Sequence, residues 1–517
     1  MSSHSVLRTK TALALGLVVG LMGLIVAACA VMPEAVESRA ESAPMVARPM
    51  ARQPKAAAPE GSTTDSSFSA ESYKSILENK SVRADENPLS TFSIDVDTAA
   101  YANVRRFLRY GELPPADAVR IEELINYFSY DYPEPEQDLP FRARTEIASC
   151  PWNADHRILH LGLQARKISF EALPPNNLVF LVDVSGSMEA PDKLPLLRTA
   201  LVLLMEEMRD EDSIAVVVYA GAAGLALPPT SLRDKHTIVQ ALENLQAGGS
   251  TAGGAGIELA YKTAQASYDA AKNNRVILCT DGDFNVGVTS ETGLVRLIEQ
   301  KRDQGIYLTV LGFGTGNYQD ATMESLADRG NGNYAYIDSI QEAKKVLVNE
   351  MGATLFTIAK DMKVQVEFNA DVVESYRLIG YENRVMRDEE FHDDAKDAGE
   401  LGAGHSVTVL YELVMAPNGA GRAMTIRYRY KQPEEQQSRY LEQEVPHDEA
   451  DWDETSDDFR FAAAVAQFGM LLRDSSHKGS SNYAAVLQLA SGALGEDAFG
   501  YRAEFVELVR IAGDLAE

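Results

Sequence analysis

Leu178-Val-Phe-Leu-Val182-Asp183-Val-Ser185-Gly-Ser187-Met188 joins an apolar run to a loop that is rich in side-chain oxygens. A short, wholly apolar run of this kind is typical of a strand that is buried on both faces. After it, one carboxylate and two hydroxyls follow at every second residue, which puts three hard oxygen ligands on one turn. Such ligands suit Mg²⁺ or Mn²⁺. The alternative is a turn that only caps the next helix.

Two later segments also place oxygens at loops. The first, Gly248-Gly-Ser250-Thr251-Ala-Gly-Gly254, carries hydroxyls on a glycine-rich turn. The second, Val276-Ile-Leu-Cys-Thr280-Asp281-Gly282, ends another apolar strand in a carboxylate. Three separate parts of the chain therefore offer oxygen ligands, which favours a metal site over a simple turn.

These three segments resemble the von Willebrand factor type A (VWA) family. Its metal-ion-dependent adhesion site combines Asp-x-Ser-x-Ser, a threonine and the aspartate of Thr-Asp-Gly. Matched residue by residue, the resemblance implies the metal ligands Asp183, Ser185, Ser187, Thr251 and Asp281. Counting back from the start of the next helix favours Thr251 over Ser250. The family implies Mg²⁺ or Mn²⁺ as cofactor, with a Glu or Asp of a protein partner completing the metal's ligands.

The rest of this region alternates between apolar strands and helical stripes. The runs 214–219, 276–280 and 306–313 are nearly continuous and apolar, whereas Leu197/Leu201/Leu204 and Ile238/Leu242/Leu245 recur at helical spacing. This pattern predicts a doubly wound, mostly parallel α/β sheet. Ligands of such sheets lie at the carboxyl ends of the strands, where Asp183 and Asp281 are expected.

Strands of another kind flank this domain. Residues 364–368, 406–411 and 424–430 alternate between apolar and polar side chains, as do two strands within 143–165. Half-exposed antiparallel strands on both sides predict a β-sandwich-like domain that flanks the α/β domain or contains it as an insertion. Helical stripes follow from Phe459 onward, so helices are expected at the C-terminal end.

The N-terminal segment has the pattern of an export signal. Arg8 and Lys10 precede the apolar run 12–32, in which Val26-Ala-Ala-Cys29 resembles a bacterial lipobox. This resemblance implies cleavage before Cys29 and its lipidation, with the outer membrane as destination if the cell is Gram-negative. The alternative is a retained transmembrane helix, since the run is long enough to span a bilayer. Both place the remaining chain outside the cytoplasm in the cell envelope, on a tether rich in Ala, Pro and Ser.

Charge and cysteine content exclude several classes of function. The formal net charge of -28 argues against a nucleic-acid partner, which needs a basic surface. Beyond Cys29, only Cys150 and Cys279 remain, and no disulfide is expected between a loop and a core strand.

Enzyme motifs are incomplete. The glycine-rich turn lacks the Gly-Lys-Ser/Thr ending of a phosphate-binding loop, so no nucleotide is expected. The eight histidines form no zinc-binding pattern, and His160 and His405 lie in strand-like sequence where structural roles are typical. The pair Asp95 and Asp97 resembles a phosphatase motif only in part, and helix capping by Asp97 or Thr98 is favoured instead.

The whole chain therefore resembles bacterial VWA-containing lipoproteins. The expected parts are a signal peptide (1–28), a disordered tether (29–88), an N-terminal α+β region (89–170), the VWA domain (171–350), a β-rich domain (351–450) and C-terminal helices (451–517). The predicted function is non-catalytic capture of an acidic residue of a protein partner through a divalent metal ion. The alternatives are a metal-dependent envelope hydrolase and a metal with a purely structural role.

Overall fold

The computed structural model describes residues 71–136, 139–249, 253–282, 291–315, 319–433 and 435–517. The predicted signal peptide, Cys29 and most of the predicted tether lie outside these residues. Among the residues described, no helix is long and apolar enough to cross a membrane.

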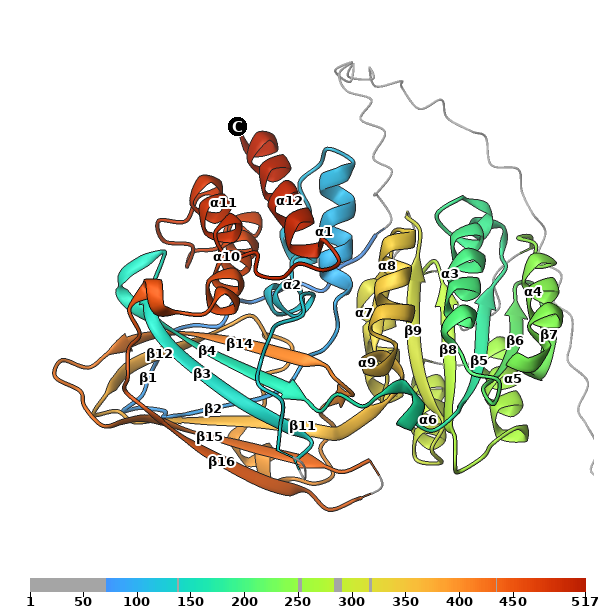
Figure 1. The fold of residues 1–517 in the computed structure, drawn as a ribbon, viewed down its shortest axis with the longest axis horizontal. Coiled ribbons are helices and arrows are strands. Elements are labelled where there is room, and N and C mark those ends of the chain that lie inside the picture. The colour runs from blue at the N-terminus through green and yellow to red at the C-terminus, as the bar shows by residue number, and fades with distance from the viewer. Residues whose placement is uncertain (1–70, 137–138, 250–252, 283–290, 316–318, 434) are drawn as a thin grey trace, which may run out of the picture. The chain divides into compact units, whose positions relative to one another are not determined.

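A sheet of six strands forms the centre of the α/β domain (Figure 1). The strand order is β10-β9-β8-β5-β6-β7, and every neighbouring pair is parallel except β6 and β7. The strands are β5 (Asn176–Asp183), β6 (Ser213–Tyr219), β7 (Ala223–Ser231), β8 (Asn273–Thr280), β9 (Tyr307–Phe313) and β10 (Tyr334–Ile337). The mostly parallel α/β sheet predicted from the sequence is confirmed.

Helices cover both faces of this sheet, which explains its continuous apolar strands. Phe180 packs with Leu197 and Leu201 on one face, whereas its neighbour Leu181 packs with Ile257 on the other. Successive side chains of a strand point to opposite faces, so both must be apolar. The helices are α3 (Leu194–Glu207), α4 (Lys235–Glu243), α5 (Gly253–Ala266), α6 (Glu291–Arg302), α7 (Asp320–Arg329), α8 (Ile340–Lys344) and α9 (Met351–Leu355), with a π-helical turn at Lys345–Asn349.

Strands from both sides of the α/β domain form the flanking β-sandwich. One sheet has the order β1-β12-β14-β4-β3, and the other has the order β13-β11-β15-β16 with β2 also paired to β11. Leu161 of β4 lies opposite Val409 of β14, and both belong to the core between the sheets. Of the two arrangements that the sequence left open, flanking and insertion, the structure shows the insertion of the α/β domain into a β-sandwich. The strands are β1 (Val82–Arg83), β2 (Leu89–Ser93), β3 (Phe141–Cys150), β4 (Asn153–Ala165), β11 (Thr357–Phe368), β12 (Val373–Ile379), β13 (Gly399–Gly402), β14 (Ser406–Met415), β15 (Arg422–Lys431) and β16 (Arg439–Pro446).

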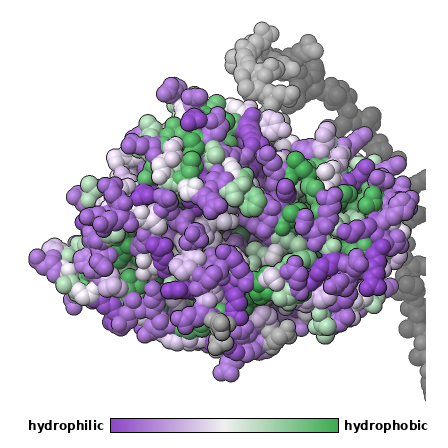
Figure 2. All heavy atoms as spheres, viewed as in Figure 1, coloured by the Kyte–Doolittle hydropathy of each residue, from purple (hydrophilic) through white to green (hydrophobic). Residues whose placement is uncertain are grey.

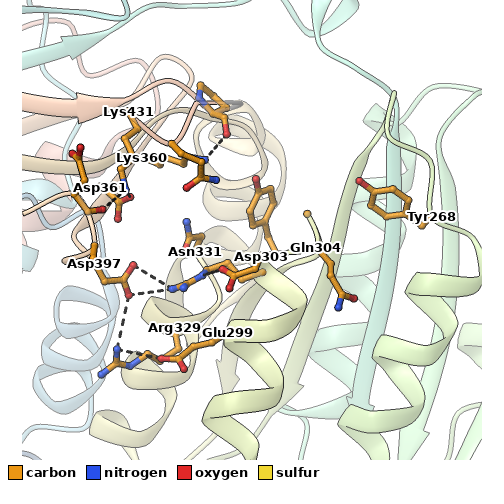
Figure 3. Close-up of a pocket in the computed structure, with 17 residues that line it drawn as sticks. Tyr268, Glu299, Asp303, Gln304, Arg329, Asn331, Lys360, Asp361, Asp397 and Lys431 are labelled. Carbon is orange, nitrogen blue, oxygen red and sulfur yellow. Dashed lines mark hydrogen bonds and ion pairs between the residues drawn. The ribbon is translucent and has the colours of Figure 1, made fainter. Parts of the chain in front are cut away.

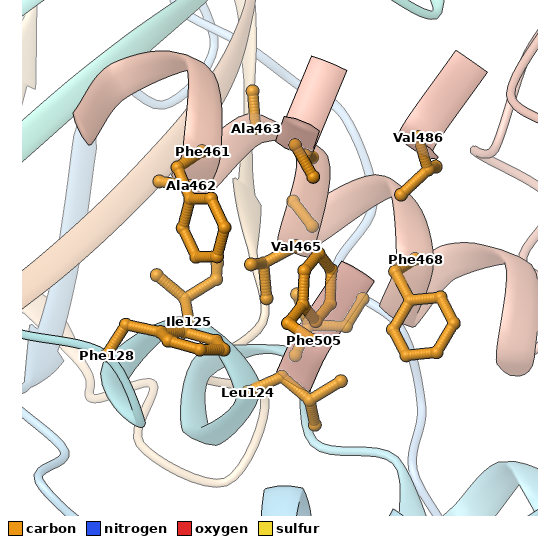
Figure 4. Close-up of a cluster of buried hydrophobic side chains, with 14 of the residues drawn as sticks. Leu124, Ile125, Phe128, Phe461, Ala462, Ala463, Val465, Phe468, Val486 and Phe505 are labelled. Carbon is orange, nitrogen blue, oxygen red and sulfur yellow. The ribbon is translucent and has the colours of Figure 1, made fainter. Parts of the chain in front are cut away.

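The first and last helices of the described chain share one hydrophobic core (Figure 4). Phe128, which follows α2, lies edge-on to Phe461 of α10 with ring centroids 4.8 Å apart. Phe461 in turn packs against Phe505 of α12, with ring centroids 5.4 Å apart. The helices are α1 (Ala99–Arg109), α2 (Ile121–Asn126), α10 (Asp457–Leu472), α11 (Tyr483–Ser491) and α12 (Tyr501–Ala516).

The cap of α1 differs from the sequence-based expectation. Thr98 is the N-cap residue, yet its side chain makes no capping hydrogen bond. Asp97 instead accepts a hydrogen bond from the backbone N–H of Tyr334, and the carboxylate of Glu123 accepts one from Ala100. A carboxylate distant in sequence thus replaces the predicted local cap, because α2 packs against the start of α1.

Arginines with little exposed side chain join the α/β domain to the segments around it. Arg105 of α1 lies 2.7 Å from Glu342 of α8, and Arg384 lies 2.8 Å from Asp328 of α7. The outer surface is mostly hydrophilic on the face shown in Figure 2, in keeping with the high charge of the sequence.

Candidate metal centre

The two aspartates predicted as metal ligands lie at the same edge of the central sheet. Asp183 ends β5, and Asp281 follows the last residue of β8, the parallel neighbour in which Cys279 lies opposite Val182. Both carboxylates are fully buried. Parallel neighbours end at a common edge, so the two acids lie at the same end of the sheet, where the sequence placed them.

Burial decreases along the first loop. Asp183 is fully buried, Ser185 is 2% exposed and Ser187 is exposed. The backbone N–H of Ser185 donates to Asp183 Oδ1 at 2.8 Å, and the two serine hydroxyl oxygens lie 2.9 Å apart. The side-chain oxygens therefore run from the domain interior to its surface, which is the geometry of a site that a partner can reach.

Backbone hydrogen bonds hold the glycine-rich segment against this loop. Gly248 donates to the carbonyl of Val184 at 2.7 Å, and Gly186 donates to the carbonyl of Gly249 at 3.1 Å. Thr251 lies outside the described residues, so its predicted role stays a prediction. The residues before it are adjacent to the Asp-x-Ser-x-Ser loop.

Glycine also sets how closely the next helix approaches the sheet. A Cβ atom on Gly256 of α5 would lie 2.8 Å from the Cβ atom of Tyr219 at the end of β6. Any larger residue would push α5 away from the strand. Tyr219 is fully buried, and its side chain interacts with Asp183.

Burial makes the charge of Asp183 costly. It raises the pKa of this carboxyl to about 6, with a smaller contribution from the negative charge of Asp281, whereas hydrogen bonding by Ser185 and Tyr219 lowers it. Within the described part of the chain, Asp183 Oδ2 is buried and has no hydrogen-bond partner of normal geometry. A buried carboxylate oxygen in this state is the kind of atom that a cation stabilises.

Lys193 is a further charged residue at this site that the sequence did not reveal. Its Nζ atom lies 2.9 Å from Asp281 Oδ2, and its side chain is only 7% exposed. The residue precedes α3 and lies 88 positions from its partner. A lysine next to a helix start gave no signal of this contact, because the contact depends on the tertiary fold.

The donor set fits a hard divalent cation. Two carboxylates and two serine hydroxyls are oxygen ligands, which Mg²⁺ and Mn²⁺ prefer. In the described residues no group of three or more His, Cys, Asp or Glu side chains could hold a metal ion, so hydroxyls would have to share the coordination. Cys279 is a buried thiol in the apolar strand β8, and burial raises its pKa, so it remains protonated and packs as an apolar side chain.

A cleft of about 520 Å³ lies near the opposite edge of the sheet, where the strands begin (Figure 3). Arg302 contacts Asp397 at 3.3 Å, and Lys431 contacts Asp361 at 2.7 Å. Arg329 lies 3.5 Å from Glu299. These cations are therefore already paired with acids of the same cleft, which leaves little charge for a ligand.

Comparison with known proteins agrees with the fold and with the resemblance noted in the sequence. The von Willebrand factor type A domain family matches residues 177–349, a family described as von Willebrand factor matches residues 67–160, and the C-terminal family of the uncharacterized protein YfbK matches 353–423 and 415–515. These matches cover the α/β domain and both of its flanks.

Individual relatives differ greatly in how much of the chain they share. Inter-alpha-trypsin inhibitor heavy chain H3 of Homo sapiens is 28% identical over 32% of this chain and 19% of its own length. A solved von Willebrand factor type A structure from Catenulispora acidiphila is 17% identical, covers 72% of this chain and 91% of its own, and has a TM-score of 0.39. The uncharacterized protein YfbK of Escherichia coli strain K12 is 42% identical over 86% of this chain and 81% of its own length. The chain therefore belongs to the YfbK family of bacterial proteins that carry a VWA domain.

Proposed function

We propose that this protein is a non-catalytic binding protein of the cell envelope. It holds Mg²⁺ or Mn²⁺ at Asp183, Ser185, Ser187, Thr251 and Asp281, and the metal binds a Glu or Asp side chain of a partner protein. The observation that carries the proposal is the rise in exposure from the buried Asp183 to the exposed Ser187. A metal at this edge of the sheet would have ligands on its inner side and solvent on its outer side.

The metal supplies Lewis-acid attraction for a carboxylate, and the chain's own residues position it. Asp183 is held by the Ser185 backbone, and the serine hydroxyls lie side by side on the loop. Mg²⁺ usually retains open water positions, so an acidic side chain can replace water there. This design also favours partner binding over a closed structural site.

Affinity capture tests this function. The soluble region, immobilised with Mg²⁺, is expected to retain a partner that EDTA releases and that Asp183→Asn fails to retain. Asp210→Asn is the matched control, because it neutralises an exposed acid in the turn before β6, at the opposite edge of the sheet. Capture that persists in EDTA or in Asp183→Asn would reject the proposal.

We further propose that Cys29 anchors the protein to a membrane through lipid, at the outer membrane if the cell is Gram-negative. The proposal rests on the sequence Val26-Ala-Ala-Cys29 after an apolar run. In cell fractionation, the wild type is expected in the membrane pellet, and Cys29→Ser is expected to lack lipid by mass spectrometry. The same uncleaved mass without lipid for both proteins would support the retained-helix alternative, whereas lipid on Cys29→Ser would show that another residue carries the lipid.

A further inference from the structure

The side chain of Lys193 reaches the metal centre through a space that the fold keeps open. A Cβ atom on Gly314, just after β9, would lie 2.2 Å from Lys193 Cε and 2.3 Å from its Cγ. Gly314 has φ of +71°, and its carbonyl accepts a hydrogen bond from the Tyr336 hydroxyl at 2.6 Å. Only glycine accommodates both this backbone conformation and the lysine stem.

The ammonium group of Lys193 pairs with the carboxylate of Asp281. Its side chain is 7% exposed and Asp281 is fully buried, so both charges have left water. Within the described ranges, Asp281 is the one carboxylate that Lys193 Nζ contacts. Burying an ammonium group is costly without such a partner, so the ion pair compensates for its loss of hydration.

The charges at the centre then set what it binds. Asp183 and Asp281 contribute -1 each and Lys193 contributes +1, which leaves a net charge of -1. A divalent cation would bring the centre to +1, and one carboxylate from a ligand would bring it back to zero. With the metal bound, the net charge of +1 would attract an acidic side chain. Without Lys193, the two aspartates and the divalent cation would sum to zero, so the centre would not attract a carboxylate by its net charge.

We propose that Lys193 is a tethered cation that competes with the divalent metal for Asp281 and couples metal binding to the binding of a carboxylate ligand. The inference rests on the proposed function, because it requires a metal at this site. A metal that uses Asp281 must displace the ammonium group or tolerate its repulsion, so Lys193 weakens metal binding. A carboxylate relieves the excess positive charge, so metal and carboxylate strengthen each other's binding by the same factor.

Calorimetric titration with Mn²⁺, in the presence and absence of acetate, tests this role. Lys193→Met is expected to bind Mn²⁺ at least about tenfold more tightly than wild type, because repulsion and competition are removed. Acetate is expected to tighten Mn²⁺ binding in the wild type and to have little effect in Lys193→Met. Lys431→Met is the matched control, since this lysine is equally buried at 7% exposure and pairs with Asp361 at 2.7 Å, far from the site. It is expected to bind as wild type does.

The outcomes separate this inference from the proposed function. Mn²⁺ binding that depends on Asp183 but is unchanged or weaker in Lys193→Met would overturn the role of Lys193 alone. Absence of Asp183-dependent binding in every variant would overturn both. If Lys193→Met folds poorly, Lys193→Gln serves as a second neutral variant. Lys193→Arg keeps the positive charge, so it is expected to bind Mn²⁺ as weakly as wild type and to bind it more tightly in acetate. A larger rise in melting temperature with Mn²⁺ for the neutral variants than for wild type is the corresponding thermal readout.

Discussion

The two edges of the central sheet differ in how their carboxylates are paired with basic side chains. Where the strands end, Lys193 pairs with Asp281, and among the described residues a buried oxygen of Asp183 has no hydrogen-bond partner of normal geometry. Near the edge where the strands begin, Arg302 and Lys431 each have a carboxylate partner in the cleft. Burial raises the pKa of Asp183 and of Asp397 to about 6 in both cases. A raised pKa alone therefore does not distinguish a candidate binding site from a structural ion pair. The two edges differ instead in how many of their carboxylates are paired with a lysine or an arginine.

Neutralising one acid at each edge gives the largest expected contrast. Asp183→Asn removes a proposed direct ligand and is expected to weaken Mn²⁺ binding by at least about 100-fold, equivalent to about 2.7 kcal/mol. Asp397→Asn is expected to leave Mn²⁺ affinity unchanged, because its carboxylate contacts Arg302 and not the site. Mn²⁺ titration of both variants measures this difference. Equal losses in the two would mean that the edges do not differ in function.

A substitution at the edge where the strands begin is expected to change stability and to leave Mn²⁺ affinity unchanged. Arg302 is 21% exposed and pairs with Asp397 at 3.3 Å. Arg302→Met leaves that partly buried carboxylate with the more distant Arg329, 4.0 Å away. We expect a loss of about 1 to 2 kcal/mol in the free energy of unfolding, without a change in Mn²⁺ affinity. Urea denaturation monitored by circular dichroism tests the first part. Arg510→Met, which removes an exposed ion pair of α12, should cost less.

The pH dependence of stability sharpens the role of Asp397. Burial, as the main cause, raises its pKa from 3.8 to about 6, and Arg302 opposes the shift. Between these pH values the folded state holds a proton that the unfolded state has lost, so stability falls as pH rises from about 4 to about 6. Allowing for partial exposure, the fall is about 1 kcal/mol.

Asp397→Asn should remove this fall, which denaturation at several pH values would measure. Other buried acids such as Glu122 and Glu324, whose pKa values are raised to about 8, remain in both proteins. The difference between variant and wild type therefore isolates Asp397. Parallel pH profiles for the two proteins would contradict the expectation.

The sequence predicted much of the edge where the strands end and little of the opposite edge, for a physical reason. Asp183 and Asp281 each follow an apolar strand, and parallel strands bring such residues together whatever the rest of the fold does. The contact of Lys193 with Asp281 depends on the slot beside Gly314, which no local pattern encodes. In the cleft, Arg302 and Asp397 likewise join α6 to a loop beyond β11, and only the packed fold brings these two residues together.

The flanking domain shows the same limit. Alternating side chains predicted half-buried strands correctly, but not that β4 pairs with β14 across the whole inserted domain. Alternation specifies a face and not a partner. In the same way, the fixed spacing of Asp97 and Thr98 before α1 predicted a local cap, whereas Glu123 supplies the hydrogen bond from another helix.

The smallest expected effect concerns the exposed end of the proposed metal-binding loop, residues 183–187. Ser187 is exposed and its hydroxyl oxygen lies 2.9 Å from that of Ser185, so Ser187→Ala removes one proposed neutral ligand and no charge. We expect Mn²⁺ affinity to fall by about threefold to tenfold, equivalent to about 1 kcal/mol, with the free energy of unfolding changed by less than about 0.5 kcal/mol. Ser231→Ala, which removes an exposed hydroxyl at the opposite edge, should leave Mn²⁺ affinity intact. If Ser187→Ala bound Mn²⁺ as tightly as wild type, the loop would not contribute this hydroxyl, and the site would end at the buried Ser185.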